Sequence, residues 1–143
     1  MLPQYSCWHQ HLNKFGMRIE TDIRPWGKYE VLLDSEKTKV KRITVSPGGK
    51  LSYQYHKHRA ENWTCVEGKV SVILNEVLYE LNPGDSIQIP QGAKHRAFND
   101  TMETSVFIEV QTGTYFGEDD IVRIKDEYNR IDEYILKRFR KNR

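Results

Sequence analysis

The chain of 143 residues is 38% hydrophobic and 29% charged, and it contains 9 glycines and 5 prolines. These proportions exclude collagen-like, low-complexity and disordered classes and indicate one globular domain. A domain of this size folds without a disulfide or a structural metal, so a bound metal would serve function. The two cysteines, Cys7 and Cys65, lie far apart in the sequence, which is typical of a reducing compartment. We therefore expect a cytoplasmic protein.

Charge is distributed unevenly along the chain. The formal net charge is +2, but residues 137–143 carry five basic side chains, which leaves −3 on the preceding residues. No nucleic-acid recognition motif accompanies this basic tail, and we expect the tail to be solvated. No apolar run approaches the ~20 residues that a membrane-spanning helix requires. The sequence therefore predicts neither nucleic acid nor a membrane as a partner.

The pattern of strands begins after an irregular N-terminal segment. Residues 1–16 show neither helical nor strand periodicity, and we expect a flexible extension before a single domain over residues 17–143. Beyond it, short apolar or alternating runs are separated by turn signals. The predicted strands cover residues 29–33, 40–45, 51–56, 63–66, 69–74, 77–81, 86–89, 95–98 and 105–111. Eight or nine strands at this spacing predict an antiparallel sandwich or barrel.

The period of the apolar residues changes near the C-terminus. Apolar side chains recur at steps of four, three, four and four along Ile124, Tyr128, Ile131, Ile135 and Phe139. This spacing predicts an amphipathic helix that packs on the sheet. The adjacent carboxylates at positions 119 and 120 precede the stretch, and we expect them to cap the helix.

Two segments carry the density of polar side chains that a metal site requires. The first contains Gln54, His56 and Glu61, and the second contains His95 after turn residues at 84, 90 and 92. Side chains alternate along a strand, so Gln54 and His56 share one face, and Glu61 would return on the neighbouring strand. Two imidazoles, a carboxylate and an amide oxygen suit Zn, Mn, Fe, Co or Ni. A pair of His56 and His58, which have the same strand parity, is the rival ligand arrangement.

These two segments resemble the two sequence motifs of the cupin superfamily, with Gln54 in place of the usual first histidine. A longer resemblance includes residues 24–27, 51–63, 90–96, 109–113 and 117–123. They are similar to the type II mannose-6-phosphate isomerase domain, and phosphomannose isomerases also use a glutamine at the first ligand position. In that family the domain is often the C-terminal half of a bifunctional enzyme whose N-terminal half is a mannose-1-phosphate guanylyltransferase.

The resemblance implies an all-β cupin fold, a jelly-roll barrel over roughly residues 24–115, followed by the C-terminal helix. It implies an isomerase that interconverts mannose 6-phosphate and fructose 6-phosphate in nucleotide-sugar biosynthesis. One divalent ion, with Zn as first choice, would be held by Gln54, His56, Glu61 and His95 and would polarise the sugar carbonyl. We also expect a homodimer, because an open barrel with an edge strand needs cover.

Three features depart from the family pattern. The chain leaves no room for a nucleotidyltransferase domain and has no glycine-rich phosphate loop, so guanylyl transfer is not expected of it. Lys57 interrupts what is commonly a run of histidines. Asn129 stands where a glycine is usual, at a position that Asn can fill in left-handed backbone. The predicted ligand set is unaffected.

Catalysis would also require a general base and cations that bind the phosphate. His58 and Lys94 flank the predicted ligands, and both are candidates for the base. Guanidinium groups bind phosphate through paired hydrogen bonds, and Arg24, Arg59 and Arg130 lie in segments that resemble the family. Two other functions stay open, which are an Fe(II) dioxygenase with the same ligands and a noncatalytic sugar- or metal-binding module.

Overall fold

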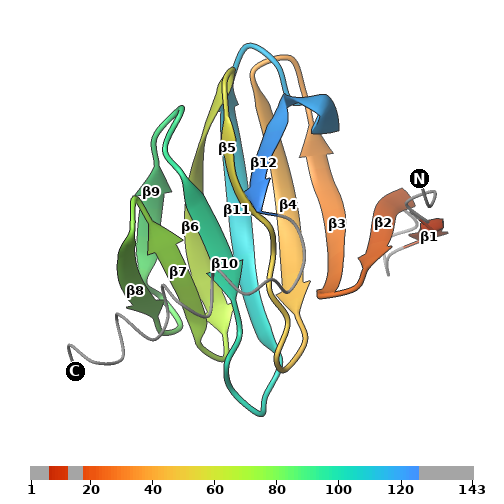
Figure 1. The fold of residues 1–143 in the computed structure, drawn as a ribbon. Helices are drawn as coiled ribbons and strands as arrows, with labels where there is room; N and C mark the ends of the chain where they lie inside the picture. The colour runs from red at the N-terminus through yellow and green to blue at the C-terminus, as the bar shows by residue number, and fades with distance from the viewer. Residues whose placement is uncertain (1–6, 13–17, 126–143) are drawn as a thin grey trace.

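Two antiparallel β-sheets face each other in the computed structural model, which describes residues 7–12 and 18–125 (Figure 1). The seven-stranded sheet has the order β1 (Cys7–Leu12), β2 (Arg18–Arg24), β3 (Gly27–Asp34), β4 (Thr38–Val45), β11 (Ser105–Gly113), β6 (Arg59–Glu67) and β9 (Ser86–Ile89). The five-stranded sheet has the order β12 (Ile121–Lys125), β5 (Tyr53–His56), β10 (His95–Phe98), β7 (Val70–Leu74) and β8 (Val77–Leu81). A short 3-10 helix, η1 (Glu118–Asp120), lies between β11 and β12.

The fold is the all-β jelly roll that the sequence predicts. Each of the nine predicted strands is present, and β8, β9 and β10 have the predicted bounds. The turn between β7 and β8 consists of Asn75 and Glu76, whose φ angles of 48° and 68° are those of a tight hairpin turn. Within the described part of the chain, no helix is long and apolar enough to cross a membrane.

Three strands lie outside the predicted set. β1 occupies part of the segment in which we saw no strand periodicity, and it pairs with β2 along its whole length. β12 contains Ile124, so the first residue of the predicted helical stripe lies in a strand instead. The β-branched residues Ile121, Val122 and Ile124 suit a strand, and β5 offers a free edge with which β12 pairs. The remaining residues of the predicted helix and the basic tail lie outside the described residues.

One end of the space between the sheets is apolar. On β4, β11 and β6, the inward-facing residues Ile43, Phe107 and Cys65 lie side by side in register, and all three are buried. Trp63 stacks on Phe107 with ring centroids 4.7 Å apart. Cys65 is fully buried among these apolar residues, and it is not in a disulfide. This core fixes the distance between the two sheets.

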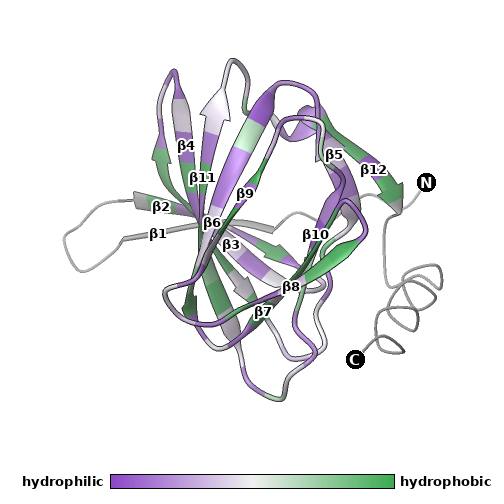
Figure 2. Ribbon diagram, turned by 90° about the vertical axis from the view of Figure 1, so that its left-hand side faces the viewer, coloured by the Kyte–Doolittle hydropathy of each residue, from purple (hydrophilic) through white to green (hydrophobic). Residues whose placement is uncertain are grey.

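The other end of the same inward-facing rows is polar. Two residues further along their strands, Lys41 and Glu109 are neighbours in register, and two residues beyond Glu109, Gln111 lies beside Glu61. All four side chains are buried. In Figure 2, β5 and the adjoining end of β6 are hydrophilic, whereas β7 is hydrophobic. Burying so many polar groups costs free energy unless they are paired, so this end of the barrel is a candidate site.

Candidate metal centre

Two histidines and a glutamate meet at the polar end of the barrel. His56 ends β5 and His95 begins β10, whereas Glu61 projects from β6 in the opposite sheet. One ligand atom from each of the three residues lies within 4.8 Å of the others. His56 Nε2 is 3.2 Å from Glu61 Oε2, and His95 Nε2 is 3.7 Å from Glu61 Oε1. Because all three side chains are buried, this group can hold a metal ion away from bulk water.

The turns around the group fix the positions of both motifs. The backbone N–H of Gly92 donates to the His56 carbonyl at 2.8 Å, which ties the second motif to the first. The Asp120 carboxylate accepts hydrogen bonds from the backbone N–H groups of Lys57 and His58, each at 3.0 Å. The expectation that the carboxylates at 119 and 120 cap a helix is therefore wrong, because a strand follows η1 and Asp120 holds the turn between β5 and β6.

The protonation state of His95 suits a metal ligand. Its Nδ1 lies 2.8 Å from the Ala93 carbonyl oxygen, and because a carbonyl only accepts, Nδ1 carries the proton. Nε2 is then left with a lone pair that faces Glu61. Burial lowers the pKa of His95 to about 4, so the ring is neutral at neutral pH.

Glu61 is held in its ionised form. Burial alone would raise the pKa of its carboxyl, but the hydrogen bond with His56 and the charge of Arg59 lower that pKa well below its usual range. Arg59 Nε donates to Glu61 Oε2 at 3.0 Å, and Trp63 Nε1 donates to Oε1 at 3.1 Å. Trp63, which packs on Phe107 in the core, therefore also orients the carboxylate.

Several buried polar atoms around the group are unsatisfied. Gln54 Oε1, His56 Nδ1 and His95 Nε2 have no hydrogen-bond partner among the described residues. Gln54 and His95 are opposite one another in the β5–β10 ladder, and Gln54 precedes His56 by two residues on the same face. Unpartnered buried acceptors are costly, and these nitrogen and oxygen donors are the types that a divalent transition metal prefers. The residues therefore fit a metal ion.

The sequence profile of the family described as mannose-6-phosphate isomerase C-terminal matches residues 13–126. The chain belongs to this family. Both motif segments and the strands that carry them lie within the matched range. The residues of the buried group therefore belong to the part of the chain that matches the family.

Curated relatives of this isomerase-family domain are longer proteins. The chain is 44% identical over 107 residues to a mannose-1-phosphate guanylyltransferase of Sinorhizobium fredii, and the aligned region covers 75% of this chain and 21% of that protein. It is 47% identical over 125 residues to the xanthan biosynthesis protein XanB of Xanthomonas campestris, which covers 87% of this chain and 25% of that protein. The chain thus spans a quarter or less of the length of these relatives.

Solved structures share the fold at low sequence identity. The capsular polysaccharide assembling protein CapF of Staphylococcus aureus has a TM-score of 0.70 at 16% identity, covering 78% of this chain and 33% of that chain. The cupin domain of Schizosaccharomyces pombe Cnp3 has a TM-score of 0.60 at 13% identity, covering 76% of this chain and 87% of that chain. These neighbours confirm the cupin fold.

A second buried carboxyl in the cupin domain was not predicted. Glu109 on β11 shares a hydrogen bond with Glu61 and accepts another from Gln111 Nε2 at 3.0 Å. Burial, together with the charge of Glu61, raises the pKa of Glu109 to about 8. Glu109 therefore carries a proton at neutral pH beside an ionised Glu61. The signal in the sequence was the alternation of polar Glu109 and Gln111 with apolar neighbours in a strand.

The two predicted bases lie outside the buried group. His58 is on the rim, with 57% of its side chain exposed and Nε2 4.0 Å from Asp120 Oδ1. It lines an open cavity of about 520 Å³ together with Lys57, Tyr115, Asp119, Asp120 and Val122. Lys94 immediately precedes β10, and its side chain is exposed. The three-residue group contains His95 and not His58, so the structure does not bring the rival histidine pair together in it.

The predicted phosphate-binding arginines are placed differently from one another. Arg59 is buried beside the centre, where its Nη2 is 3.4 Å from His56 Nε2 and its Nε contacts Glu61. Arg24 is further away on β2 and forms an ion pair with Asp22 at 2.7 Å. Arg130 lies outside the described residues, as does Asn129.

Proposed function

We propose that this domain is a metal-dependent aldose–ketose isomerase that interconverts mannose 6-phosphate and fructose 6-phosphate. The observation that carries the proposal is the buried group of His56, Glu61 and His95, in which the two imidazoles each leave an unsatisfied nitrogen. Membership of the mannose-6-phosphate isomerase C-terminal family supports the choice of substrate.

The metal ligands in this proposal are Gln54, His56, Glu61 and His95. A divalent ion, with Zn as first choice, would supply Lewis-acid polarisation of the sugar carbonyl when bound. The chain's own contribution is to keep Glu61 ionised and His95 neutral, and to exclude bulk water from both. Arg59 and Trp63 hold the Glu61 carboxylate in one orientation.

The isomerisation also moves a proton between neighbouring carbons. A base on the protein takes the proton from C2 of the aldose, an enediol forms, and the proton is delivered to C1 to give the ketose. His58 and Lys94 are the candidates for this base. The position of His58 in the open cavity at the same turn as His56 supports His58.

Cations would hold the phosphate and position the reacting carbons. Of the two predicted arginines that the structure describes, Arg59 is the nearer to the buried group, and Arg24 and Arg130 complete the proposed set. Because a charge-assisted hydrogen bond to phosphate is lost with an unphosphorylated sugar, mannose should be a far poorer substrate than mannose 6-phosphate.

A coupled assay for fructose 6-phosphate tests the function. Metal-loaded protein should convert mannose 6-phosphate, and a chelator should abolish turnover until metal is restored. Absence of turnover by fully metallated protein, with mannose 6-phosphate still bound, would favour the noncatalytic module instead. Oxygen uptake by the iron-loaded protein would favour the dioxygenase.

A further inference from the structure

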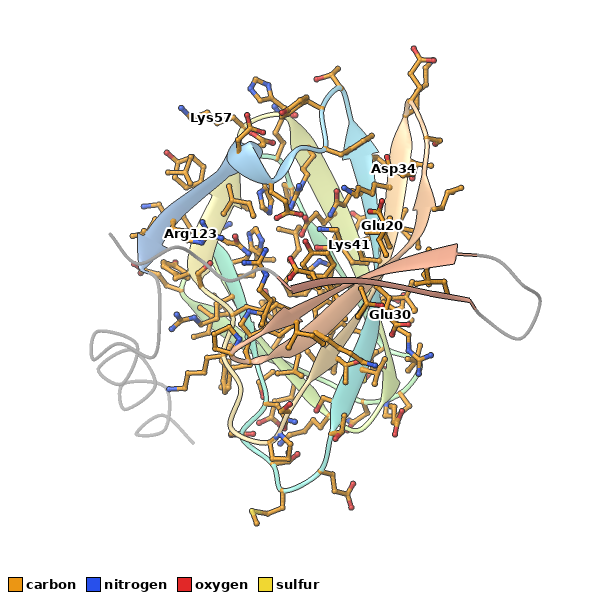
Figure 3. All side chains as sticks on the ribbon, turned by 90° about the vertical axis from the view of Figure 1, so that its right-hand side faces the viewer. Glu20, Glu30, Asp34, Lys41, Lys57 and Arg123 are labelled. Carbon is orange, nitrogen blue, oxygen red and sulfur yellow. The ribbon has the colours of Figure 1, made fainter. Side chains whose placement is uncertain are left out.

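A buried lysine near the metal centre is held by a carboxylate from the connection between the sheets. Lys41 lies on β4 with only 5% of its side chain exposed, and its Nζ is 2.5 Å from Glu118 Oε1 of η1. The same Nζ lies 4.1 Å from the centre of the Tyr29 ring. Figure 3 shows Lys41 in the middle of the molecule, whereas Lys57 and Arg123 lie at its periphery. Neither the predicted ligand set nor the predicted phosphate site uses this lysine.

Several cations surround the Glu118 carboxylate. Burial would raise the pKa of Glu118, but the hydrogen bond from Lys41 and the charges of Lys41, Arg59 and Lys39 lower it. Arg59 and Lys39 already have carboxylate partners of their own, at 3.0 Å and 3.8 Å. Lys41 differs, because it is itself buried while the Glu118 carboxylate that it contacts belongs to a 3-10 turn and has 36% of its side chain exposed. Glu118 therefore lies where an incoming anion could replace it.

The position of Lys41 relative to the metal centre suits the far end of a phosphorylated sugar. Lys41 is opposite Glu109 in the β4–β11 ladder, and Glu109 is hydrogen-bonded to Glu61. Two strand spacings, about 10 Å in all, separate β4 from β6, and Glu61 lies two residues along β6 from Trp63, which is opposite Glu109. A hexose that presents its carbonyl to the metal centre and carries its phosphate on the last carbon has a similar extent.

We propose that Lys41 binds the phosphate of the substrate and that the Glu118 carboxylate occupies this phosphate position in the ligand-free protein. The inference rests on the proposed function and adds to it a specificity-determining residue and a competing internal anion. The phosphate replaces the Glu118 carboxylate as the partner of Lys41 Nζ. Binding therefore requires the Glu118 side chain to turn toward solvent. Its partial exposure at the end of the barrel makes that movement possible.

Calorimetric titration of metal-free protein tests the proposal without turnover. The probes are inorganic phosphate and mannose 6-phosphate, with mannose as the unphosphorylated comparison. Glu118→Gln should lower the Kd for both phosphate probes about tenfold, because it removes the competing charge and keeps the shape of the side chain. Lys41→Met should raise the Kd by at least about tenfold. Neither substitution should change the response to mannose.

Exposed residues of the turn between β3 and β4 provide matched controls. Glu36→Gln and Lys37→Met make the same changes in charge without touching the pair, and both should bind phosphate like the wild type. The double variant Lys41→Met/Glu118→Gln leaves no unpaired charge, and it should fold yet bind phosphate as weakly as Lys41→Met. The proposal is overturned if Glu118→Gln binds phosphate no more tightly than Glu36→Gln, or if the double variant binds phosphate like the wild type.

Turnover by metal-loaded protein separates this proposal from the proposed function. If mannose 6-phosphate is isomerised but Lys41→Met leaves its KM unchanged, the phosphate position is wrong and the function stands. If the substitutions change phosphate binding as expected but no variant turns over the sugar, the isomerase function is wrong and the phosphate position stands.

Discussion

Glu61 accepts hydrogen bonds from two residues on its own strand, Arg59 and Trp63, each two positions away. Alternation along β6 therefore places a cation, a carboxylate and an indole on one face, and the carboxylate needs no distant partner to be oriented. Glu109, on the neighbouring strand, shares a proton with the same carboxylate. At the scale of single residues, the centre is an ionised carboxylate that faces the neutral ring of His95 and the ring of His56.

Replacing either histidine should remove the metal. His56→Ala and His95→Ala each take away one nitrogen donor, and metal affinity should fall at least about 100-fold, since loss of even an outer partner of a ligand costs about 10- to 100-fold. Elemental analysis after gel filtration measures the bound metal. His58→Ala is the matched control and should keep its metal, although turnover should fall if His58 is the base. Stoichiometric metal in both His56→Ala and His95→Ala would show that the ligands are others.

Glu61→Gln should separate charge from shape. The amide keeps the size of the side chain and the contact with Trp63, but it removes the charge that attracts a cation. The fraction of protein that retains metal should therefore fall strongly, whereas the thermal midpoint of the metal-free protein should change little. A variant that unfolds yet binds metal normally when refolded would contradict this role.

Glu109 should make the metal-free protein less stable as pH rises. Its pKa is about 8 in the folded state, above the ordinary carboxyl value of 4.5, so between these two values the folded state holds a proton that the unfolded state has lost. Stability from this group is fully present below about pH 4.5 and is lost as pH rises toward 8. Glu109→Gln should flatten the slope in this range. Urea unfolding at pH 5 and pH 8 measures how the free energy of unfolding changes with pH. An equal change in the wild type and in Glu109→Gln would contradict the assignment.

Among the elements, the connection from β11 to β12 joins the two sheets. β11 ends in the seven-stranded sheet, η1 follows, and β12 then pairs with β5 of the other sheet. The end of β11 lies against the turn between β5 and β6, where a Cβ on Gly113 would be 2.3 Å from the His58 carbonyl oxygen. This connection therefore supports the turn that separates His56 from Glu61.

Asp120→Ala should loosen that turn. The substitution removes the acceptor of two backbone hydrogen bonds, from Lys57 and His58, and should cost about 1–3 kcal/mol in the free energy of unfolding. Metal affinity should fall with it, because the turn positions both His56 and Glu61. Chemical denaturation of Asp120→Ala beside Asp119→Ala measures the difference. Equal stability of the two variants would show that Asp120 does not hold the turn.

The nine strands from β3 to β11 could be predicted because alternation and turn residues are local signals. β12 could not, because Ile124 fits a helical stripe as well as a strand, and the choice depends on the free edge of β5, which is some 65 residues away in the chain. The same distinction applies to the site. Spacing within two motifs indicated His56, Glu61 and His95, whereas Lys41 and Glu109 come together only through the register of β4 and β11.

For the whole molecule, the seven-stranded sheet extends beyond the barrel through β2 and β1 (Figure 1). β1 is an edge strand, and an unpaired edge is a template for another strand. Ile23 on β2, which is opposite Cys7 of β1, is 46% exposed. These features favour pairing between two copies of the chain.

We therefore predict a homodimer that depends on the N-terminal strand. Light scattering should give twice the chain mass for the full chain, and removal of residues 1–16 should shift the mass toward the monomer. A monomer mass for the full chain that does not change with concentration would contradict the prediction.

The central claim is that this domain isomerises a phosphorylated sugar at its His56, Glu61 and His95 centre. Phosphorus NMR of the metal-loaded protein tests the claim most directly, because the reaction can be started from either sugar phosphate and both compounds can be quantified in the same sample. We predict that samples started from mannose 6-phosphate and from fructose 6-phosphate reach the same final ratio, and that His95→Ala leaves both unchanged. A fully metallated wild-type protein that leaves both sugar phosphates unchanged would contradict the account.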